Sequence, residues 1–347
     1  MTASSSMRAA RLDEDLEVAV AEMPVPAVGP GELLVRTRAC GICSGDVMGW
    51  YMRRKAPLVF GHEPAGEVVA IGDGVEEFRP GDRVFVHHHA PCFACDLCAR
   101  GEFVQCAAWR AGRIIPGGMA EYFLVPPGTV RGDTLRLPDG VSFADATLIE
   151  PVACTVKSLR RAGMTGGERM VVVGLGIMGQ LHVLLARDAG ARQVIGLDRV
   201  PFRLQHALAC GADAVVNVDD RDPIAAVHEL TGGALADVVI VGPGSIEAME
   251  LGLRLAGRGA TVVLFTASQP DERLSVRPYD LYFREIRLVP SYSCGPNDTH
   301  DALALIANRV VTAAHVVTHQ FPLADIAEAY RTAATGGASL KTIVTFP

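Results

Sequence analysis

One stretch of the chain, residues 170–290, constrains the fold most strongly because it repeats a single pattern. Short runs of apolar, often β-branched residues alternate there with segments of helical periodicity. Runs that are apolar at nearly every position are typical of strands buried on both faces of a parallel sheet. The stretch therefore predicts a doubly wound parallel α/β unit. Strands are expected at 170–174, 193–198, 213–218, 237–242, 261–266 and 284–290, and the clearest helices at 180–189, 201–210 and 245–255.

The first predicted strand runs directly into the motif Gly174-Leu-Gly176-Ile177-Met178-Gly179, and a helical pattern follows it. The first glycine permits a tight turn, the second lets the backbone approach a pyrophosphate, and the third lets helix and strand pack closely. The N-terminus of the helix attracts the phosphate charge. A glycine-rich turn alone would be weak evidence, but strand, motif and helix in this order predict a dinucleotide site.

An acidic residue, Asp198, stands nineteen residues after Gly179, at the end of the second predicted strand. A carboxylate at that place accepts hydrogen bonds from the adenosine ribose and repels a 2′-phosphate, which predicts NAD in preference to NADP. Arg203 is expected beside the cofactor. Arg199 or Arg203 could weaken the preference, although both are equally well explained as solvated arginines at the start of a helix.

The two ends of the chain differ from this central stretch. Residues 1 to about 150 contain short strand-like pieces between Pro- and Gly-rich turns, which predicts a mainly β domain with long loops. The tail is too short to fold alone, so we expect it to return to the first domain. The predicted domains are 1–153, 154–290 and 291–347. Outside the central stretch, strands are expected at 32–39, 66–71, 82–87, 120–125 and 342–346. Helices are expected in the C-terminal part at 301–309 and 323–334.

Four of the nine cysteines stand close together, at Cys92, Cys95, Cys98 and Cys106. Thiolates at these intervals suit a closed tetrahedral zinc site, which has no open position and therefore a structural role. The alternative is a set of reduced, buried cysteines, but four of them in a polar loop would be unusual packing. An odd total with this clustering favours metal ligation in a reducing compartment over a disulfide framework. We expect a cytoplasmic protein with a structural zinc ion.

Other metal-ligating residue types are scattered along the chain: Cys43 in GICSGD, His62 and Glu63 in GHEPAG, and Glu150 in LIEP. Each alone has an ordinary explanation, since a single cysteine is usually core and Gly-His-Glu can be a turn. Together, one thiolate, one imidazole and one carboxylate leave a fourth zinc position for water or an alcohol. The combination predicts a second, catalytic zinc ion.

The order of these motifs resembles that of the zinc-dependent medium-chain dehydrogenase/reductase family. The resemblance rests on Gly-Ile-Cys43, on Gly-His62-Glu63 with the glycines that follow, on the four-cysteine loop and on the Rossmann glycines, and it covers essentially the whole chain. It implies an α/β fold in which a Rossmann domain, a doubly wound parallel sheet, is inserted into a mainly β GroES-like catalytic domain, with the active site in the cleft between them. Glu150, with the proline after it, resembles the sorbitol, polyol and threonine dehydrogenase branch.

The resemblance also implies roles for single residues. Cys43, His62 and either Glu63 or Glu150 would hold the catalytic zinc, the other carboxylate would lie near the metal-bound water, and Asp46 would orient the ligating histidine. The implied reaction is hydride transfer between a polar secondary alcohol and NAD, with zinc polarising the hydroxyl group. The implied partners are a small-molecule substrate and further copies of the chain in a homo-oligomer, by analogy a tetramer.

One motif departs from the family pattern. Members of the sorbitol dehydrogenase type read Cys-Gly-Ser-Asp-x-His, and the serine and histidine help to move the hydroxyl proton to solvent, whereas this chain has Gly45 and Met48 there. Ser44 is displaced by one residue. The proton must then leave through water, through a carboxylate, or through a histidine of the run 87–89. Glu150 is favoured because a carboxylate within hydrogen-bond reach can accept it.

Four residues are candidates for the substrate pocket. Trp50 and Tyr51 could wall it, although aromatic residues at such positions are more often core. Tyr292 and Ser293 align with a segment that approaches nicotinamide and polyol in sorbitol dehydrogenases. In the histidine run 87–89, alternate side chains at a strand end point to opposite faces, so one of them is expected to face the cleft.

Charge and hydropathy exclude other classes of protein. The chain has 32 Lys+Arg against 39 Asp+Glu, a net charge of −7, and no basic run that could follow a phosphate backbone, so no nucleic-acid partner is expected. Its apolar stretches end well before the roughly 18–20 residues that span a bilayer, so no membrane is expected. The predicted function is a zinc-dependent NAD oxidoreductase for a polyol, sugar-derived alcohol or aminocyclitol. The alternatives are an isomerase or lyase that retains NAD for internal redox, and a non-enzymatic zinc-ribbon module, against which the charge and the open zinc site argue.

Overall fold

The computed structural model describes residues 6–347; residues 1–5, at the start of the predicted domain 1–153, lie outside the described part. The chain forms two compact units. One contains the residues up to Ala153 together with Cys294–Pro347, and the other contains Cys154–Ser293. No helix within residues 6–347 is both long enough and apolar enough to cross a membrane.

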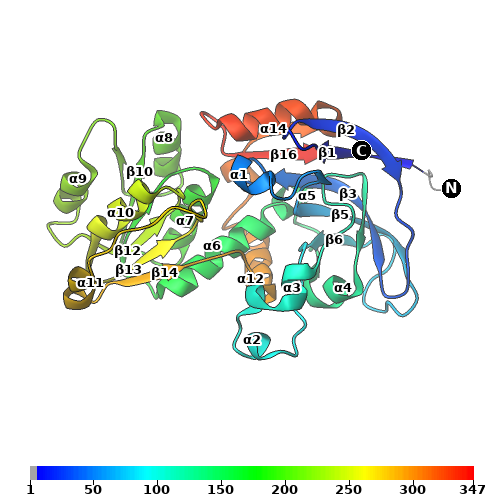
Figure 1. Ribbon diagram of the computed structural model, residues 1–347, viewed down its shortest axis with the longest axis horizontal. Helices are drawn as coiled ribbons and strands as arrows, with labels where there is room; N and C mark the ends of the chain where they lie inside the picture. The colour runs from blue at the N-terminus through cyan, green and yellow to red at the C-terminus, as the bar shows by residue number, and fades with distance from the viewer. Residues whose placement is uncertain (1–5) are drawn as a thin grey trace. The chain divides into compact units, whose positions relative to one another are not determined.

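The unit of Cys154–Ser293 is built on one parallel sheet of six strands (Figure 1). Its strand order, β11-β10-β9-β12-β13-β14, is that of the doubly wound dinucleotide-binding fold, so the predicted fold of this stretch is confirmed. The valines and isoleucines of the central strands are buried because both faces of the sheet are covered. The bounds are β9 Arg169–Val173, β10 Gln193–Asp198, β11 Ala214–Asn217, β12 Ala236–Val241, β13 Ala256–Leu264 and β14 Arg287–Pro290.

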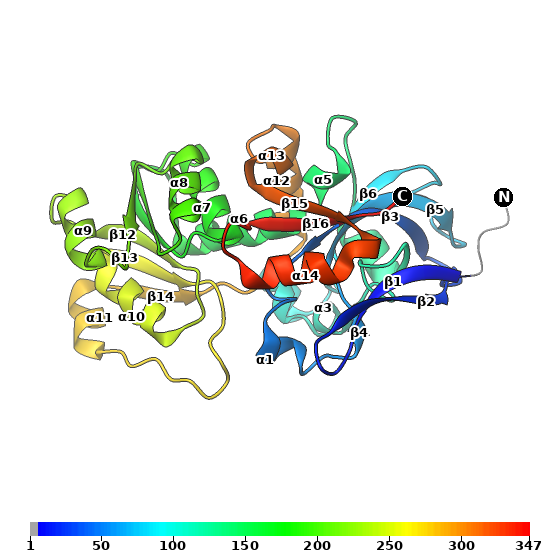
Figure 2. The same ribbon diagram turned by 90° about the horizontal axis from the view of Figure 1, so that it is seen from above.

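Helices cover both faces of this sheet: Figure 2 shows α7 (Ile177–Asp188) and α8 (Pro201–Ala209) on one side, and α10 (Ile246–Leu255) and α11 (Pro278–Arg284) on the other. α9 (Pro223–Leu230) and α11 are not among the predicted helices. The prediction of a strand from residue 284 is wrong at its start. Arg284 ends α11 and Glu285 takes a left-handed conformation with φ 52°, so β14 begins only at Arg287.

The other unit is mainly β. One sheet has the order β15-β16-β3-β5-β6-β8 with β7 paired to β3, and a smaller sheet has the order β2-β1-β4. β16 pairs antiparallel with β3, placing Thr342 opposite Ile42, so the tail returns to the first part of the chain. The bounds are β1 Ser6–Leu12, β2 Val18–Pro24, β3 Leu33–Ile42, β4 Leu58–Val59, β5 Glu63–Ile71, β6 Arg83–Val86, β7 Tyr122–Val125, β8 Thr134–Arg136, β15 Val317–Pro322 and β16 Lys341–Thr345.

The helices of this unit are mostly short. The division between the two units falls within the longest of them, α6, after Ala153. The predicted helix 323–334 is a 3₁₀ turn, Leu323–Asp325, followed by α14. The bounds are α1 Gly49–Met52, α2 Asp96–Ala99, α3 Ala107–Ala111, α4 Pro127–Asp133, α5 Phe143–Ala146, α6 Ile149–Ala162, α12 Pro296–Ala307, α13 Ala313–Val316 and α14 Ile326–Thr335, with a further 3₁₀ turn at Phe103–Gln105.

His182 is a fully buried histidine on α7, in the parallel-sheet unit. Its Nδ1 lies 2.6 Å from the carbonyl oxygen of Met178 and its Nε2 lies 2.6 Å from the Ser158 hydroxyl oxygen. The neutral ring donates from Nδ1 to Met178, and its Nε2 faces the Ser158 hydroxyl, which also contacts the Thr155 carbonyl oxygen at 2.8 Å. Burial lowers the pKa of His182 to about 4, because a charged ring would lose its hydration.

We expect His182 to make the protein less stable as the pH falls from 6.5 towards 4. The unfolded ring takes up a proton near its ordinary pKa of 6.5 and the folded ring only near 4, so the unfolded state binds more protons in this window. The stability lost approaches about 3 kcal/mol at 1.36 kcal/mol per pKa unit. Urea unfolding should show the difference in unfolding free energy between wild type and His182→Gln shrinking as the pH falls; a constant difference would contradict the prediction.

Candidate metal centres and dinucleotide site

The four clustered cysteines converge in the mainly β unit. Cys95 directly precedes α2, Cys98 lies within it, and Cys106 directly precedes α3. The sulfur of Cys98 lies 3.6 Å from that of Cys95 and 4.0 Å from that of Cys92, and the sulfurs of Cys92 and Cys106 are 3.6 Å apart. A tetrahedral zinc ion with Zn–S bonds of about 2.3 Å holds its sulfurs about 3.8 Å apart. The four side chains therefore fit a zinc ion.

This loop has little hydrophobic core of its own. Cys98 and Cys106 are buried with only Val104 and Trp109 in a separate small cluster. Burial would raise the pKa of Cys106, but backbone N–H groups, first that of Cys92 at 3.4 Å from its sulfur, lower it to about 6. The lowered pKa favours the thiolate of Cys106, whereas burial and the neighbouring thiols raise the pKa of Cys98 to about 12. A bound ion would supply the cross-link that the small core cannot.

Strand pairing brings a second set of donors together. β3 and β5 pair antiparallel with Gly41 opposite Glu63, so Cys43, just after β3, meets His62, just before β5. Ligand atoms of Cys43, His62 and Glu63 lie within 4.8 Å of one another. A thiol, an imidazole and a carboxylate are the donor types of a catalytic zinc site, and three of them leave one tetrahedral position open.

Asp46 fixes the orientation of His62. Its Oδ1 lies 3.3 Å from His62 Nδ1, and its Oδ2 accepts a hydrogen bond from the Cys43 backbone N–H at 3.1 Å. Tyr330 donates its hydroxyl to the Asp46 carbonyl oxygen at 2.8 Å and holds this turn in place. Burial would lower the pKa of His62, but Asp46 and Cys43 raise it well above 6.5. With Nδ1 directed at a carboxylate, Nε2 is the ring atom left to hold a metal.

Lys341 holds the carboxylate of Glu63. The two side chains are almost completely buried and form an ion pair, and Lys341 Nζ also donates to the carbonyl oxygen of Ile42 at 3.0 Å. A Cβ at Gly41 would overlap the Glu63 carboxylate, so only glycine leaves room for it. Within residues 6–347, Glu63 Oε1 is buried with no hydrogen-bond partner. A buried carboxylate oxygen in that state fits a metal ligand.

The structure places Glu63, rather than Glu150, in the donor group with Cys43 and His62. Burial raises the pKa of Glu63, Lys341 opposes this, and Glu150 raises it further, so the two carboxylates are near enough to repel each other. Glu150 itself lies in the first turn of α6, in a separate buried group with His87 and Cys294.

The three consecutive histidines have different surroundings. His87 is fully buried, with its Nδ1 2.8 Å from Asp133 Oδ2. The His88 ring centre lies 4.9 Å from that of His62, and His88 Nδ1 is buried with no hydrogen-bond partner in the described part of the chain. His89 packs on Trp109 with ring centres 4.1 Å apart. Of the three histidine rings, His88 is the one that contacts the His62 ring.

The glycine motif joins β9 to α7 in the parallel-sheet unit. Gly174 has φ 84°, and a Cβ there would lie 2.8 Å from the ring of Pro243, so the turn requires glycine. A Cβ at Gly179 would overlap the carbonyl oxygen of Gly174, which is why the helix can start so close to the strand. Gly176 precedes α7 without a side-chain cap, and the first-turn N–H groups of Ile177 and Met178 have no intrahelical acceptor. The turn can therefore receive a pyrophosphate.

Asp198 ends β10 next to this turn. Its Oδ2 accepts a hydrogen bond from the Leu175 N–H at 2.7 Å, and its Oδ1 accepts from the N–H groups of Arg199 and Val200 at 2.8 and 2.9 Å. Arg203 Nη1 lies 3.8 Å from Oδ2. The carboxylate thus fastens the glycine turn to the next strand, and Arg203 offsets part of its charge.

The predicted pocket residues fall in two places. Trp50 and Tyr51 lie on α1 with ring centres 5.8 Å apart, and Tyr51 packs against the hydrophobic core of the mainly β unit. Tyr292 and Ser293 end the other unit, where Tyr292 is exposed and Ser293 has φ 51°. In the relay segment, Ser44 is exposed and the Gly45 N–H points to Cys43 Sγ at 3.3 Å.

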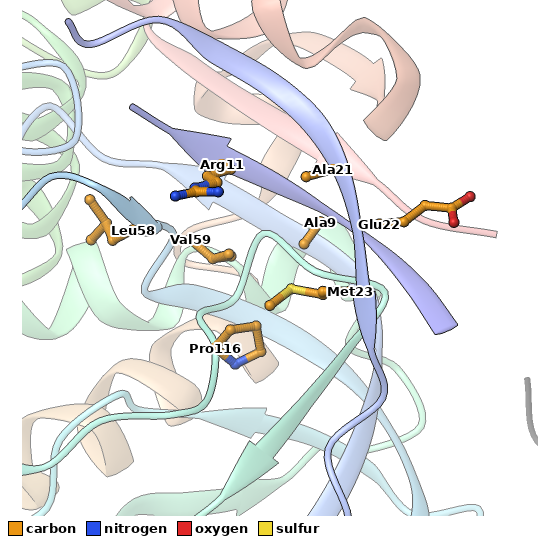
Figure 3. A pocket seen from close by; sticks show the side chains of 8 residues that line it. All are labelled: Ala9, Arg11, Ala21, Glu22, Met23, Leu58, Val59 and Pro116. Atoms are coloured by element: carbon orange, nitrogen blue, oxygen red, sulfur yellow. The ribbon is translucent and has the colours of Figure 1, made fainter. Parts of the chain in front are cut away.

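Three residues of these groups were not predicted: Lys341, Asp133 and Cys294. Lys341 carries only a weak signal, because it directly precedes the predicted final strand 342–346 and a lysine is seldom buried. Asp133 and Cys294 carry none, since nothing near them in the sequence indicates their partners. A pocket on the small sheet contains no residue of the three metal-ligating groups (Figure 3); it is lined by Ala9, Arg11, Ala21, Glu22, Met23, Leu58, Val59 and Pro116.

Comparison with known proteins gives consistent matches. Residues 29–136 match the alcohol dehydrogenase GroES-like domain, and residues 177–308 match the zinc-binding dehydrogenase family. The chain is 32% identical over 336 residues to sorbitol dehydrogenase of Halalkalibacterium halodurans, covering 94% of this chain and 95% of that protein. It is 30% identical over 348 residues to sorbitol dehydrogenase 1 of Saccharomyces cerevisiae, covering 95% and 96%. A zinc-binding dehydrogenase structure from Sinorhizobium meliloti, bound to NADP, superposes with a TM-score of 0.89 at 29% identity, covering 99% of this chain and all of that one.

A mainly β GroES-like unit with cysteine-containing donor groups, combined with a Rossmann unit, defines an oxidoreductase of the alcohol dehydrogenase type. The chain belongs to the zinc-dependent medium-chain dehydrogenase/reductase family, in its sorbitol and polyol branch.

Proposed function

We propose that this protein oxidises a polar secondary alcohol, namely a polyol, a sugar-derived alcohol or an aminocyclitol, with NAD as hydride acceptor. The observation that carries the proposal is the convergence of Cys43, His62 and Glu63 in one donor group. Three donors would leave one position of a tetrahedral zinc ion for the substrate. The sorbitol dehydrogenase relatives support the substrate class. The domains 1–153 and 291–347 would together form the catalytic part, and 154–290 the dinucleotide-binding part.

The proposed catalytic zinc ligands are Cys43, His62 and Glu63, and the proposed structural ligands are the four clustered cysteines, giving two zinc ions per chain. When bound, zinc lowers the pKa of the substrate hydroxyl and NAD accepts the hydride. Asp46 holds the His62 ring in position and Lys341 holds the Glu63 carboxylate, so the chain keeps the donors preorganised. The motif 174–179, with Asp198 and Arg203, would bind the dinucleotide.

Proton removal is assigned to Glu150. Neither Gly45 nor Met48 offers an exchangeable side-chain proton, and Ser44 is exposed. Glu150 is buried and raises the pKa of Glu63 by charge repulsion, which supports a second carboxylate near the proposed zinc ligands. A carboxylate in that position can accept the hydroxyl proton as a general base.

Replacing Glu150 by Gln should lower kcat by about a hundredfold, the usual contribution of a general base, and should alter the pH profile. The amide is nearly the same size but cannot accept a proton. Zinc at Cys43 and at the four cysteines should stay at the wild-type level, measured by elemental analysis alongside steady-state kinetics. Loss of zinc at the Cys43 site would make Glu150 a ligand; an unchanged rate and pH profile would leave water as the proton acceptor.

Gly45→Ser is the matched variant for this test. A Cβ at Gly45 would lie 3.6 Å from Cys43 Sγ, an ordinary contact, so the substitution should fold. It restores the serine of the family pattern. If Glu150 already removes the proton efficiently, Gly45→Ser should change kcat little, whereas a large gain would show that the wild type lacks an efficient relay.

Cofactor reduction tests the proposed function directly. Purified protein with NAD and a panel of polyols, aminocyclitols and amino alcohols should give a steady rise in NADH absorbance with at least one member. Conversion of substrate without net NADH would instead identify an isomerase or lyase that uses NAD internally.

We predict that kcat/KM is at least about tenfold higher with NAD than with NADP. The Asp198 carboxylate repels a 2′-phosphate, and a tenfold preference corresponds to only about 1.4 kcal/mol. Removing the opposing charge with Arg203→Ala should strengthen the preference. Equal values for the two cofactors would show that the arginines neutralise Asp198, and an NADP preference would contradict the assignment.

A homo-oligomer, proposed as a tetramer, is supported by one surface of the parallel-sheet unit. α11 exposes Tyr279, Tyr282 and Phe283, which are 66%, 75% and 59% accessible, beside the edge strand β14. Exposed aromatic residues next to an open sheet edge are typical of a protein interface. Light scattering that shows a monomer would refute the oligomer.

The nine free cysteines suit a reducing compartment, and we propose the cytoplasm.

A further inference from the structure

A second mixed donor group lies in the mainly β unit, apart from the one proposed to hold the catalytic zinc. His87 follows β6, Glu150 lies in the first turn of α6, and Cys294 stands two residues before α12. All three side chains are buried, and their ligand atoms lie within 4.8 Å of one another. The tertiary structure thus collects an imidazole, a carboxylate and a thiol from three distant parts of the chain.

The spacing of these atoms matches metal coordination. His87 Nε2 lies 3.6 Å from Cys294 Sγ. With Zn–S of about 2.3 Å and Zn–N of about 2.0–2.1 Å, a tetrahedral zinc ion holds sulfur and nitrogen about 3.6 Å apart. In the absence of metal the same contact is a thiol–imidazole hydrogen bond, so the metal would replace a proton between the two atoms.

Neighbouring residues orient the His87 imidazole in the way that zinc binding requires. His87 Nδ1 lies 2.8 Å from Asp133 Oδ2, and Asp133 Oδ1 accepts a hydrogen bond from the Thr299 hydroxyl at 2.5 Å. The backbone N–H of His87 also donates to the Asp133 carbonyl oxygen at 3.0 Å. A carboxylate on one ring nitrogen directs the other nitrogen at the metal, the arrangement common behind zinc-binding histidines.

Charge balance favours a divalent cation at this place. Acidic side chains meet both nitrogens of the buried His87 ring, with Asp133 Oδ2 at 2.8 Å from Nδ1 and Cys294 Sγ at 3.6 Å from Nε2. One thiolate and one carboxylate compensate both charges of a zinc ion, with a neutral imidazole as the third donor. A soft sulfur, a nitrogen and an oxygen together select zinc over magnesium or calcium.

We propose that His87, Glu150 and Cys294 form an additional zinc-binding site, which fills when zinc is in excess and inhibits the enzyme by taking up the Glu150 carboxylate. Binding displaces the protons of the thiol and of His87 Nε2, and no electron transfer is involved. The inhibitory part rests on the proposed role of Glu150 as proton acceptor. The binding part does not, because it depends only on the three donors.

Zinc binding is tested first, by equilibrium dialysis of the holoenzyme against zinc followed by elemental analysis. Wild type and the control Cys210→Ser, which changes a buried cysteine outside all three metal-ligating groups, should bind one zinc ion more than Cys294→Ser. His87→Gln should also lack this ion, and circular dichroism should show that each variant is folded. Equal zinc content in all four proteins would overturn the proposal.

Inhibition is tested second, with each protein's rate under added zinc compared with its own rate without it. Added zinc should reduce the rates of wild type and Cys210→Ser at least about tenfold when the additional site is full, and should reduce that of Cys294→Ser much less. Inhibition that is equal in Cys294→Ser would overturn the inhibitory part. Binding without inhibition would overturn it as well, and would remove Glu150 from proton transfer while leaving the zinc site and the dehydrogenase activity in place.

Discussion

Alcohol oxidation by His62→Ala should be about a thousandfold slower than by the wild type, with the fold intact. His62 supplies the only imidazole in the donor group with Cys43 and Glu63, and without it the zinc ion is lost or displaced. A metal acting as Lewis acid contributes several kcal/mol to transition-state stabilisation, and each 1.36 kcal/mol corresponds to a tenfold change in rate. The side chain is partly exposed, so its removal leaves no large cavity.

The measurement combines steady-state kinetics, elemental analysis and circular dichroism. The exposed His300 on α12 provides a control, because His300→Ala should keep both rate and zinc. Cys43→Ala should behave as His62→Ala does. Asp46→Ala should cost only about 10–100-fold, because it removes the support of a ligand rather than the ligand. Near-normal turnover in His62→Ala would refute the catalytic assignment.

Replacing Cys95 by Ala should remove one zinc ion per chain and lower Tm by roughly 10 °C. Cys95 is the appropriate choice because its side chain is less buried than those of Cys98 and Cys106, so the change removes a ligand without opening the core. The loop depends on this ligand because, within residues 6–347, its small buried core consists of Val104 and Trp109 with Cys98 and Cys106.

Calorimetry with zinc analysis tests this prediction, and Cys210→Ala controls for the loss of a cysteine in general. Activity per folded molecule should persist at low temperature, because none of the four cysteines belongs to the Cys43 donor group. Unchanged zinc content and Tm in Cys95→Ala would show that the loop binds no metal. Loss of activity without loss of stability would show that the four-cysteine site has the catalytic role and the Cys43 site the structural role.

The Rossmann unit was the most predictable part of the fold, for a local reason. Strands buried on both faces are apolar at nearly every position, so residues such as Val171 and Val239 mark them without knowledge of their neighbours. The errors occur where the signal is weak. The start of β14 was misplaced because the polar residues around Arg284 fit a helix end or a strand equally well.

The sequence by itself determined those features whose members lie close together along the chain. The four cysteines fall within fifteen positions and the glycine motif within six, so their spacing alone predicts a zinc site and a dinucleotide-binding turn. It also named Cys43, His62, Glu63 and Glu150 as donors by residue type. The sequence could not predict which of these donors lie together in space, because neighbouring positions in the chain do not show which carboxylate reaches which imidazole.

Only the tertiary structure decided that grouping. The antiparallel pairing of β3 with β5 places Cys43 beside His62, and the pairing of β16 with β3 brings Lys341 to the carbonyl oxygen of Ile42, 299 residues earlier in the chain. Burial then makes the Lys341–Glu63 ion pair necessary, because neither charge could remain there alone. The folding of distant segments against one another likewise joins Cys294 to His87, a contact that depends on strand register and packing rather than on sequence spacing.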